Sequence, residues 1–175
     1  MKIGGLEKVS LIDYPGKICA VVFTQGCNFR CPYCHNPELV DPRRYGPCLA
    51  EKELIRFLSA RRGKLDAVTI TGGEPTLQKD LAAFIGKIRK MGFAVKLDTN
   101  GSHPSVVGRL IGANLLDYIA MDVKAPLEKY EAVTGFPQAA EAVRESIRLV
   151  LAADIGHEFR LTLVNQRLRQ LFQIP

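Results

Sequence analysis

The chain has 175 residues, of which 47% are hydrophobic and 24% charged, values typical of a soluble globular protein with one well-packed domain. No apolar run reaches the roughly 18 residues of a membrane span, and the N-terminus lacks the apolar core of a signal peptide, so we predict a cytoplasmic protein without membrane contact. The net charge is +6, but aromatic side chains are not interleaved with the basic ones. This favours solvated helix ends over a nucleic-acid surface, and an acidic protein partner would also fit the charge.

The order of predicted elements indicates an α/β fold. Residues 1–17 are expected to be a lead-in segment that ends in the turn signal Asp13-Tyr14-Pro15-Gly16. Beyond it, short apolar runs typical of buried parallel strands alternate with helical patterns, which predicts right-handed βαβ units. The predicted strands are 18–23, 67–70, 94–97, 118–121 and 158–164. The predicted helices are 51–61, 80–91, 104–111 and 139–153, and residues 165–175 form a short polar pattern that does not continue the alternation.

The five cysteines are clustered in a way that indicates metal or redox use, not a disulfide framework. Cys27, Cys31 and Cys34 are separated by three and then two residues, with no obvious fourth ligand, so a metal cluster held by them would keep one metal atom open. Cys19 lies in an apolar run and is predicted to be buried. Cys48 lies in a loop with proline and glycine and is the less favoured candidate for a fourth ligand.

A polar or glycine-containing segment follows each of the first four predicted strands. These segments are 24–27, 71–75, 98–101 and 122–124. Because the carboxyl ends of parallel strands face the same side of an α/β fold, we expect the four segments to converge on one pocket. Each segment alone has an ordinary explanation as a turn or a surface ion pair, so their shared position carries the prediction.

The second segment suggests a place for a ligand amine. Gly72 and Gly73 have no side chains, which would let a ligand approach the backbone closely. The carboxylate of Glu74 would then stand beside that opening, placed to accept a hydrogen bond from an ammonium group.

The third and fourth segments add charged groups at neighbouring strand ends. Asp98 and Asp122 could bind hydroxyl groups or, together with Thr99, a hard cation through oxygen ligands. Lys124 could neutralise a ligand carboxylate or pair with an aspartate.

Three kinds of site could contain the clustered cysteines. A structural zinc site needs four ligands, commonly in two separated pairs, and the adjacency of His35 to Cys34 disfavours it. Cys31-Pro32-Tyr33-Cys34 has the form of a glutaredoxin site, but a redox protein of that kind leaves Cys27 and the other segments unexplained. A 4Fe–4S cluster with its fourth iron open to a ligand that carries an amine and a carboxylate accounts for all of them.

These motifs resemble those of the radical S-adenosylmethionine (SAM) superfamily. The resemblance rests on Cys-x3-Cys-x2-Cys with an aromatic residue at Tyr33, and on Gly72-Gly73-Glu74-Pro75 at a second strand end. It extends from about Gly4 to about Val164. Within the superfamily the chain is similar to activases of glycyl-radical enzymes, above all to activating proteins of anaerobic ribonucleoside-triphosphate reductase. The segments that carry this similarity are 5–17, 23–28, 34–39, 98–101 and 121–126.

The resemblance implies roles for individual residues. Cys27, Cys31 and Cys34 would hold the 4Fe–4S cluster. Contacts to SAM would come from all four segments, and Gly73 with its neighbours would meet the methionine amino group. The implied SAM-binding residues are Tyr33, Cys34, His35, Gly72, Gly73, Glu74, Asp98, Asn100, Asp122, Val123 and Lys124. A monovalent cation held by Asp98, Thr99 and Asp122 is also implied.

The activity that the resemblance implies is reductive cleavage of SAM. An electron donor such as flavodoxin or ferredoxin would reduce the cluster, and methionine and a 5′-deoxyadenosyl radical would form. The radical would take a hydrogen atom from a glycine Cα of the partner enzyme and so install a glycyl radical on the anaerobic reductase. The alternatives are activation of another glycyl-radical enzyme, another radical SAM reaction, an inactive truncated form that binds the cluster, and a non-enzymatic iron–sulfur or redox protein.

The implied fold is a partial (β/α) barrel in a single domain of residues 1–175. Barrels of this superfamily usually have six strands, and about five are recognised here in the core of residues 18–164. Residues 165–175 do not resemble the strand and helix with which such barrels continue. We therefore predict a C-terminally truncated barrel with an open sheet edge beside the fifth strand.

Overall fold

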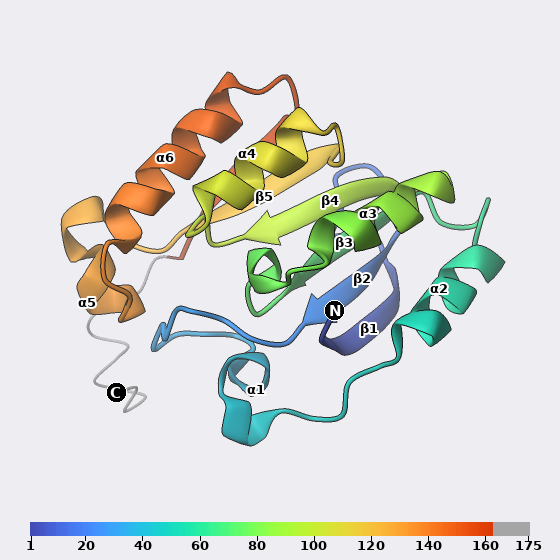
Figure 1. Ribbon diagram of the computed structural model, residues 1–175, viewed down its shortest axis with the longest axis horizontal. Helices are drawn as coiled ribbons and strands as arrows, with labels where there is room; N and C mark the ends of the chain where they lie inside the picture. The colour runs from blue at the N-terminus through green and yellow to red at the C-terminus, as the bar shows by residue number, and fades with distance from the viewer. Residues whose placement is uncertain (163–175) are drawn as a thin grey trace.

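The computed structural model describes residues 1–162, which build one sheet of six strands in the order β1-β2-β3-β4-β5-β6 (Figure 1). Five neighbouring strands run parallel, and they are the five runs predicted from the sequence: β2 (Cys19–Thr24), β3 (Ala67–Gly72), β4 (Ala94–Thr99), β5 (Tyr118–Val123) and β6 (Gly156–Leu161). Within the described residues β1 and β6 are the two edges and do not pair with each other, so the sheet is an open, partial barrel as expected.

The first strand corrects the prediction that residues 1–17 only lead into the fold. β1 (Ile3–Ser10) pairs antiparallel with β2 and raises the strand count from about five to six. It carries Gly4 and Gly5 and has irregular register at two places, so it lacks the apolar run by which the parallel strands are recognised.

Four helices match the predicted ones within one or two residues at each end: α2 (Glu51–Ala60), α3 (Leu81–Lys90), α4 (Pro104–Gly112) and α6 (Ala139–Ala152). Two further helices, α1 (Pro37–Val40) and α5 (Tyr130–Thr134), were not predicted, because so few residues show no helical period. Short 3₁₀ turns at Pro42–Arg44, Pro75–Leu77 and Leu127–Lys129 complete the connections.

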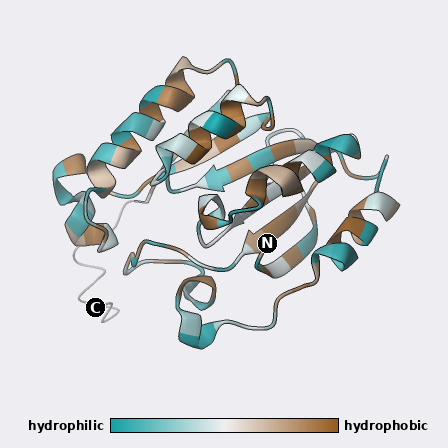
Figure 2. Ribbon diagram, in the orientation of Figure 1, coloured by the Kyte–Doolittle hydropathy of each residue, from teal (hydrophilic) through white to brown (hydrophobic). Residues whose placement is uncertain are grey.

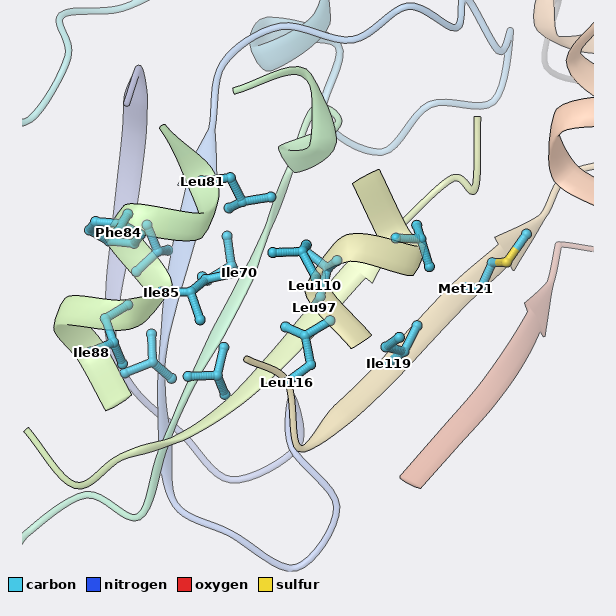
Figure 3. Packing of buried hydrophobic residues seen from close by; sticks show 14 of the residues in the cluster. Ile70, Leu81, Phe84, Ile85, Ile88, Leu97, Leu110, Leu116, Ile119 and Met121 are labelled. Atoms are coloured by element: carbon cyan, nitrogen blue, oxygen red, sulfur yellow. The ribbon is translucent and has the colours of Figure 1, made fainter. Parts of the chain in front are cut away.

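The main apolar core lies between one face of the sheet and the helices that cover it (Figures 1 and 3). Ile70 and Leu97 point from the strands towards Ile85 of α3 and Leu110 of α4, and all four side chains are buried. The helices carry apolar residues in stripes, with polar residues on their other sides (Figure 2). This face of the sheet is therefore closed to ligands.

The opposite face of the sheet is partly filled by the loop between β1 and β2. Tyr14 of this loop packs against Cys19, Val21 and Ala67 in a second, smaller apolar cluster. The carbonyl oxygen of Asp13 accepts hydrogen bonds from Thr69 Oγ1 at 3.1 Å and Lys96 Nζ at 2.7 Å. The loop thus closes the amino-terminal half of this face and leaves the carboxyl-terminal half for the site.

Two predictions concern the ends of the chain and the membrane. No helix within residues 1–162 combines the length and the apolar character that a membrane crossing requires. The predicted polar tail of residues 165–175, and the truncation inferred from it, lie outside the described residues.

The packing of α3 on the sheet predicts a large cost for truncating Ile85. Replacing this fully buried side chain with alanine should lower the free energy of unfolding by about 2–5 kcal/mol, because it leaves a cavity in a close-packed core. The matched control is Ile12→Ala, since Ile12 is 90% exposed and its substitution should change stability by less than about 0.5 kcal/mol. Urea denaturation of both variants measures the difference, and equal effects would contradict the described packing.

Candidate functional site

The segments that follow the parallel strands meet around one cavity of about 420 Å³. Twelve of the thirteen residues proposed for the cluster or SAM line this cavity, and Val123 is the exception. The twelve are Cys27, Cys31, Tyr33, Cys34, His35, Gly72, Gly73, Glu74, Asp98, Asn100, Asp122 and Lys124. Val123 packs instead against the apolar core on the other side of the sheet, because neighbouring strand residues face opposite ways. The strand-end argument therefore predicted the position of the cavity correctly.

The loop that carries the three cysteines is fixed to the end of β5 and to α5. Tyr33 Oη donates a hydrogen bond to the carbonyl oxygen of Lys124 at 2.5 Å, and the Arg30 N–H donates to the carbonyl oxygen of Thr134 at 2.7 Å. Phe29 is buried, with its ring centroid 6.2 Å from that of Tyr130. These contacts hold the cysteine loop over the same strand end that presents the charged residues.

The Cys27 sulfur accepts two N–H groups, from the backbone of Phe29 at 3.4 Å and from the side chain of Asn100 at 3.8 Å. Burial raises the pKa of the Cys27 thiol to about 12, and it also raises the pKa of Cys31. Ligation by a metal must therefore release protons from these thiols. Donors aimed at the sulfur favour the thiolate that ligation creates and are a known influence on cluster potential.

The described donors do not form a site for a single metal ion. Within residues 1–162, no three His, Cys, Asp or Glu side chains stand close enough to share one ion. Cluster thiolates each bind a different iron, whereas the ligands of zinc all lie about 2.0–2.3 Å from one ion. Cys48 is exposed and its thiol donates to Gln25 Oε1 at 3.2 Å outside the cavity, so its proposed alternative role as fourth ligand gains no support.

The two glycines after β3 are needed by the packing of the protein itself. A Cβ atom on Gly73 would lie 2.1 Å from the carbonyl oxygen of Gly26, and one on Gly72, whose φ is +112°, would lie 2.4 Å from the nitrogen of Thr24. The Gly73 and Glu74 N–H groups donate to the carbonyl oxygens of Thr24 at 2.8 Å and Gly26 at 2.7 Å. The glycines thus let the cysteine loop and the end of β3 lie against each other, a reason that differs from the ligand access expected from the sequence.

The carboxylate of Glu74 is fully buried and already bonded within the protein, which corrects the expectation that it faces a ligand ammonium group. Oε1 accepts from the Thr76 N–H at 3.1 Å, from the Thr76 hydroxyl, and from the Thr99 hydroxyl at 2.7 Å. Oε2 accepts from the Asn100 N–H at 2.7 Å. Burial raises the pKa of Glu74, while these hydrogen bonds act against the rise. The side chain joins the ends of β3 and β4.

The floor of the cavity carries a chain of ion pairs across three strands. Arg160 Nε lies 3.1 Å from Asp122 Oδ1, and Arg160 Nη2 lies 3.1 Å from Asp98 Oδ2. Lys124 Nζ binds Asp122 Oδ2 at 2.9 Å. The buried Lys96 extends the chain, with Nζ 3.1 Å from Asp98 Oδ1 in an ion pair that lacks the alignment of a hydrogen bond. Burial raises the pKa of Asp98, and the two neighbouring cations act against that rise.

Sequence reasoning missed Lys96 and Arg160, which both face the cavity side of the sheet. It also missed Asn28, which accepts from Asn100 Nδ2 at 3.1 Å and donates to Ser102 Oγ at 2.9 Å. The signal for the two basic residues was present, because a charged residue at an alternate position of an apolar strand must face a polar partner or water. Asn28 carried no such signal.

A comparison with family models decides the family. The model described as the Radical SAM superfamily matches residues 21–167, which is most of the chain. The chain belongs to the radical SAM superfamily. The family assignment drawn from the cysteine and Gly-Gly-Glu-Pro motifs is therefore confirmed.

Curated relatives carry several activities in their names. A Methanocaldococcus jannaschii protein named as a glycyl-radical enzyme activating enzyme is 42% identical over 151 residues, which are 85% of this chain and 61% of that protein. The pyruvate formate-lyase-activating enzyme of Clostridium pasteurianum is 32% identical over 77% of this chain and 57% of its own length. A Halobacterium salinarum protein named as a GTP 3′,8-cyclase is 37% identical over 78% of this chain and 39% of its own length. The chain therefore spans about 39–61% of the length of these relatives.

Solved structures show a similar fold at low sequence identity. A structure of anSMEcpe with bound AdoMet, another name for SAM, superposes with a TM-score of 0.64 at 16% identity, over 86% of this chain and 44% of that one. QueE from Escherichia coli gives a TM-score of 0.54 at 16% identity, over 90% of this chain and 92% of that one. Likeness at this level supports the arrangement of the partial barrel.

The position of Glu74 predicts that its neutral isostere is costly. In Glu74→Gln an NH₂ group must replace either Oε1, which faces the Thr76 N–H, or Oε2, which faces the Asn100 N–H. A buried donor would then oppose a donor, so the free energy of unfolding should fall by about 1–3 kcal/mol.

Chemical denaturation measures this loss, and Glu145→Gln on the exposed side of α6 is the control that should remain near the stability of the parent chain. Equal stability of the two variants would show that the Glu74 carboxylate does not have the described partners.

Proposed function

We propose that this chain is a radical SAM activating enzyme that binds a 4Fe–4S cluster and SAM in the cavity and generates a glycyl radical on a partner enzyme. The observation that carries the proposal is the convergence of the three cysteines, the Gly-Gly segment and the Asp122–Lys124 strand end on one cavity of about 420 Å³. Support for the activase subgroup comes from the identity to the Methanocaldococcus jannaschii and Clostridium pasteurianum proteins. When bound, the cluster would supply the electron for reductive cleavage of SAM.

The chain's own residues would bind and orient the cofactors. The thiolates of Cys27, Cys31 and Cys34 are proposed to ligate three irons, which leaves the fourth without a protein ligand. Because both oxygens of the Glu74 carboxylate already accept hydrogen bonds inside the protein, this segment would offer a ligand ammonium group its backbone carbonyl oxygens.

The opposite wall of the cavity is proposed to bind the anionic end of SAM. Lys124 is held by Asp122 with its ammonium group at the cavity, where it would meet the methionine carboxylate. Tyr33 and His35 line the cavity beside the cysteines and would contact the remainder of the cofactor. Asp98 and Asn100 would shape the floor, and Asn100 would also donate to the Cys27 sulfur as it does in the structure.

We further propose anaerobic ribonucleoside-triphosphate reductase as the partner, with flavodoxin or ferredoxin as the electron donor and the cytoplasm as the location. The sequence motifs at 5–17 and 34–39 support this choice within the activase group. That the whole chain forms a single domain is part of the same proposal. The monovalent cation implied by the family resemblance is left out of it, because a guanidinium group lies where the ion was expected.

A second candidate is radical chemistry on a small molecule, favoured by the 37% identity to the protein named as a GTP 3′,8-cyclase. The two candidates share the SAM cleavage step and differ in the group that gives up hydrogen. Electron paramagnetic resonance on a mixture with the reductase would show a glycine-centred radical in the first case. Consumption of GTP without such a signal would replace the first candidate with the second.

Loss of a cluster cysteine should abolish the proposed activity. After anaerobic reconstitution with iron and sulfide, the parent chain should bind about four irons and release 5′-deoxyadenosine from SAM when reduced, since three cysteines suffice for a cluster with one open iron. Cys31→Ser should lose at least about 100-fold in that release, because even the groups that only hold a metal ligand in place are typically worth about 10–100-fold in activity. High-performance liquid chromatography of the nucleoside products measures it.

The matched control is Cys48→Ser, which removes an exposed thiol outside the cavity and should retain the release of the parent chain. A parent chain that forms the cluster but releases no 5′-deoxyadenosine would contradict the proposed function. Retention of full activity by Cys31→Ser would contradict the ligand assignment.

A further inference from the structure

The side chain of Arg160 reaches across the cavity face of the sheet from β6 to β4. Its Nε binds Asp122, the residue directly beside it on β5, and its Nη2 binds Asp98, which lies one strand further on. Both N–O distances are 3.1 Å. The guanidinium group therefore stands between the two carboxylates that were expected to hold a monovalent metal ion.

Ala120 makes this reach feasible. It lies beside Asp98 on one side and Glu158 on the other, on the same face of the sheet as Asp122. Neighbouring strands are about 4.8 Å apart, so the backbones of β6 and β4 are about 10 Å apart, a distance that the side chains of Arg160 and Asp98 span together. The small side chain at this position leaves room between the two strands that flank β5.

The third expected ligand points elsewhere. Thr99 follows Asp98 in the strand and also lines the cavity, but strand alternation turns its hydroxyl away from the Asp98 carboxylate. Its hydroxyl donates to Glu74 Oε1 at 2.7 Å and accepts from the Gly101 N–H at 3.1 Å. The three oxygen ligands expected for a hard cation are thus already engaged. The carboxylates of Asp98 and Asp122 are paired with Arg160, and the Thr99 hydroxyl is bonded to Glu74.

The ion-pair chain is also balanced in charge, which leaves it no net attraction for an added cation. Three carboxylates, those of Asp98, Asp122 and Glu158, are matched by three basic groups. These three basic groups are those of Lys96, Lys124 and Arg160. The Lys96 Nζ lies 3.1 Å from Asp98 and 3.6 Å from Glu158.

We propose that Arg160 is a built-in counter-cation, which takes the place of a monovalent metal ion between Asp98 and Asp122 and makes SAM binding in this cavity independent of K⁺ and Na⁺. A guanidinium group suits the position because its planar fork donates to two carboxylates in fixed geometry. Burial acts against its charge, but Asp98 and Asp122 outweigh that effect and raise the pKa of Arg160.

Arg160 is also a positioning residue for the ligand-binding end of β5. It holds Oδ1 of Asp122, and Lys124 holds Oδ2 of the same carboxylate. Without Arg160 the carboxylate can turn, and the lysine ammonium group loses its fixed position at the cavity. The SAM-related part of this inference rests on the proposed function, whereas the cation-related part concerns the chain alone.

The first experiment measures the thermal midpoint of the full chain without cluster or SAM, in KCl, NaCl or N-methylglucamine chloride at equal ionic strength. The parent chain should melt at the same temperature in all three salts. Arg160→Gln should show a saturable rise in KCl or NaCl, because it frees two neighbouring carboxylates to bind a metal ion and binding to the native state raises the midpoint. Arg160→Lys, which keeps the charge, should again be indifferent to the cation.

The second experiment measures SAM binding to the cluster-loaded chain by equilibrium dialysis in the same salts. The affinity of the parent chain for SAM should agree within about twofold between KCl and N-methylglucamine chloride. Arg160→Gln should bind SAM about tenfold more tightly in KCl than in N-methylglucamine chloride, which corresponds to roughly one charge-assisted contact. Arg144→Gln removes an exposed arginine paired with Glu141 and is the control that should behave as the parent.

A saturable, K⁺- or Na⁺-specific rise in the midpoint of the parent chain would overturn the proposal. So would an Arg160→Gln variant that folds, shows no cation response and binds SAM as the parent does. If Arg160→Gln does not fold, the salt series on the parent and Arg160→Lys still decides the question. These melting curves need no SAM cleavage, so a failure here is distinguishable from a failure of the proposed function.

Discussion

The buried carboxylate of Glu74 is the contact on which the site depends. It accepts hydrogen bonds from groups on both sides of the gap between β3 and β4, including Thr99 and the backbone of Asn100. Directly before it, Gly73 lies against Gly26 so closely that even a methyl group would collide. A carboxylate that is isolated from water and fully bonded is costly to disturb. The cysteine loop and two strand ends are therefore held as one unit.

The alternation of strand residues divides the sheet into an apolar face and a chemical face. Leu97 packs under the helices, while its neighbours Lys96 and Asp98 face the cavity side. The charges on that side compensate one another from strand to strand, with Arg160 as the widest link. A cavity whose own charges are paired in this way can bind a ligand that carries both an ammonium and a carboxylate group, such as the methionine end of SAM.

The sequence predicted the features that depend on local pattern and on strand direction. The apolar runs identified the five parallel strands, and the rule that sites gather at their carboxyl ends placed the cysteines and Gly72-Gly73 around one cavity. It could not show that Glu74 turns inward or that Arg160 reaches Asp98, because both depend on which strands become neighbours. It also missed β1, since an edge strand with glycines and an irregular register has no clear period.

The proposed function requires that the cavity holds a 4Fe–4S cluster with one iron open to SAM. Electron paramagnetic resonance of the reconstituted, reduced chain tests it most directly, with spectra recorded alone, with SAM and with adenosine. A cluster signal whose g-values shift with SAM and stay unchanged with adenosine, which lacks the amino and carboxylate groups, is the predicted result. A cluster signal that SAM leaves unchanged, or the absence of any such signal after reconstitution, would show that the cavity does not hold such a cluster.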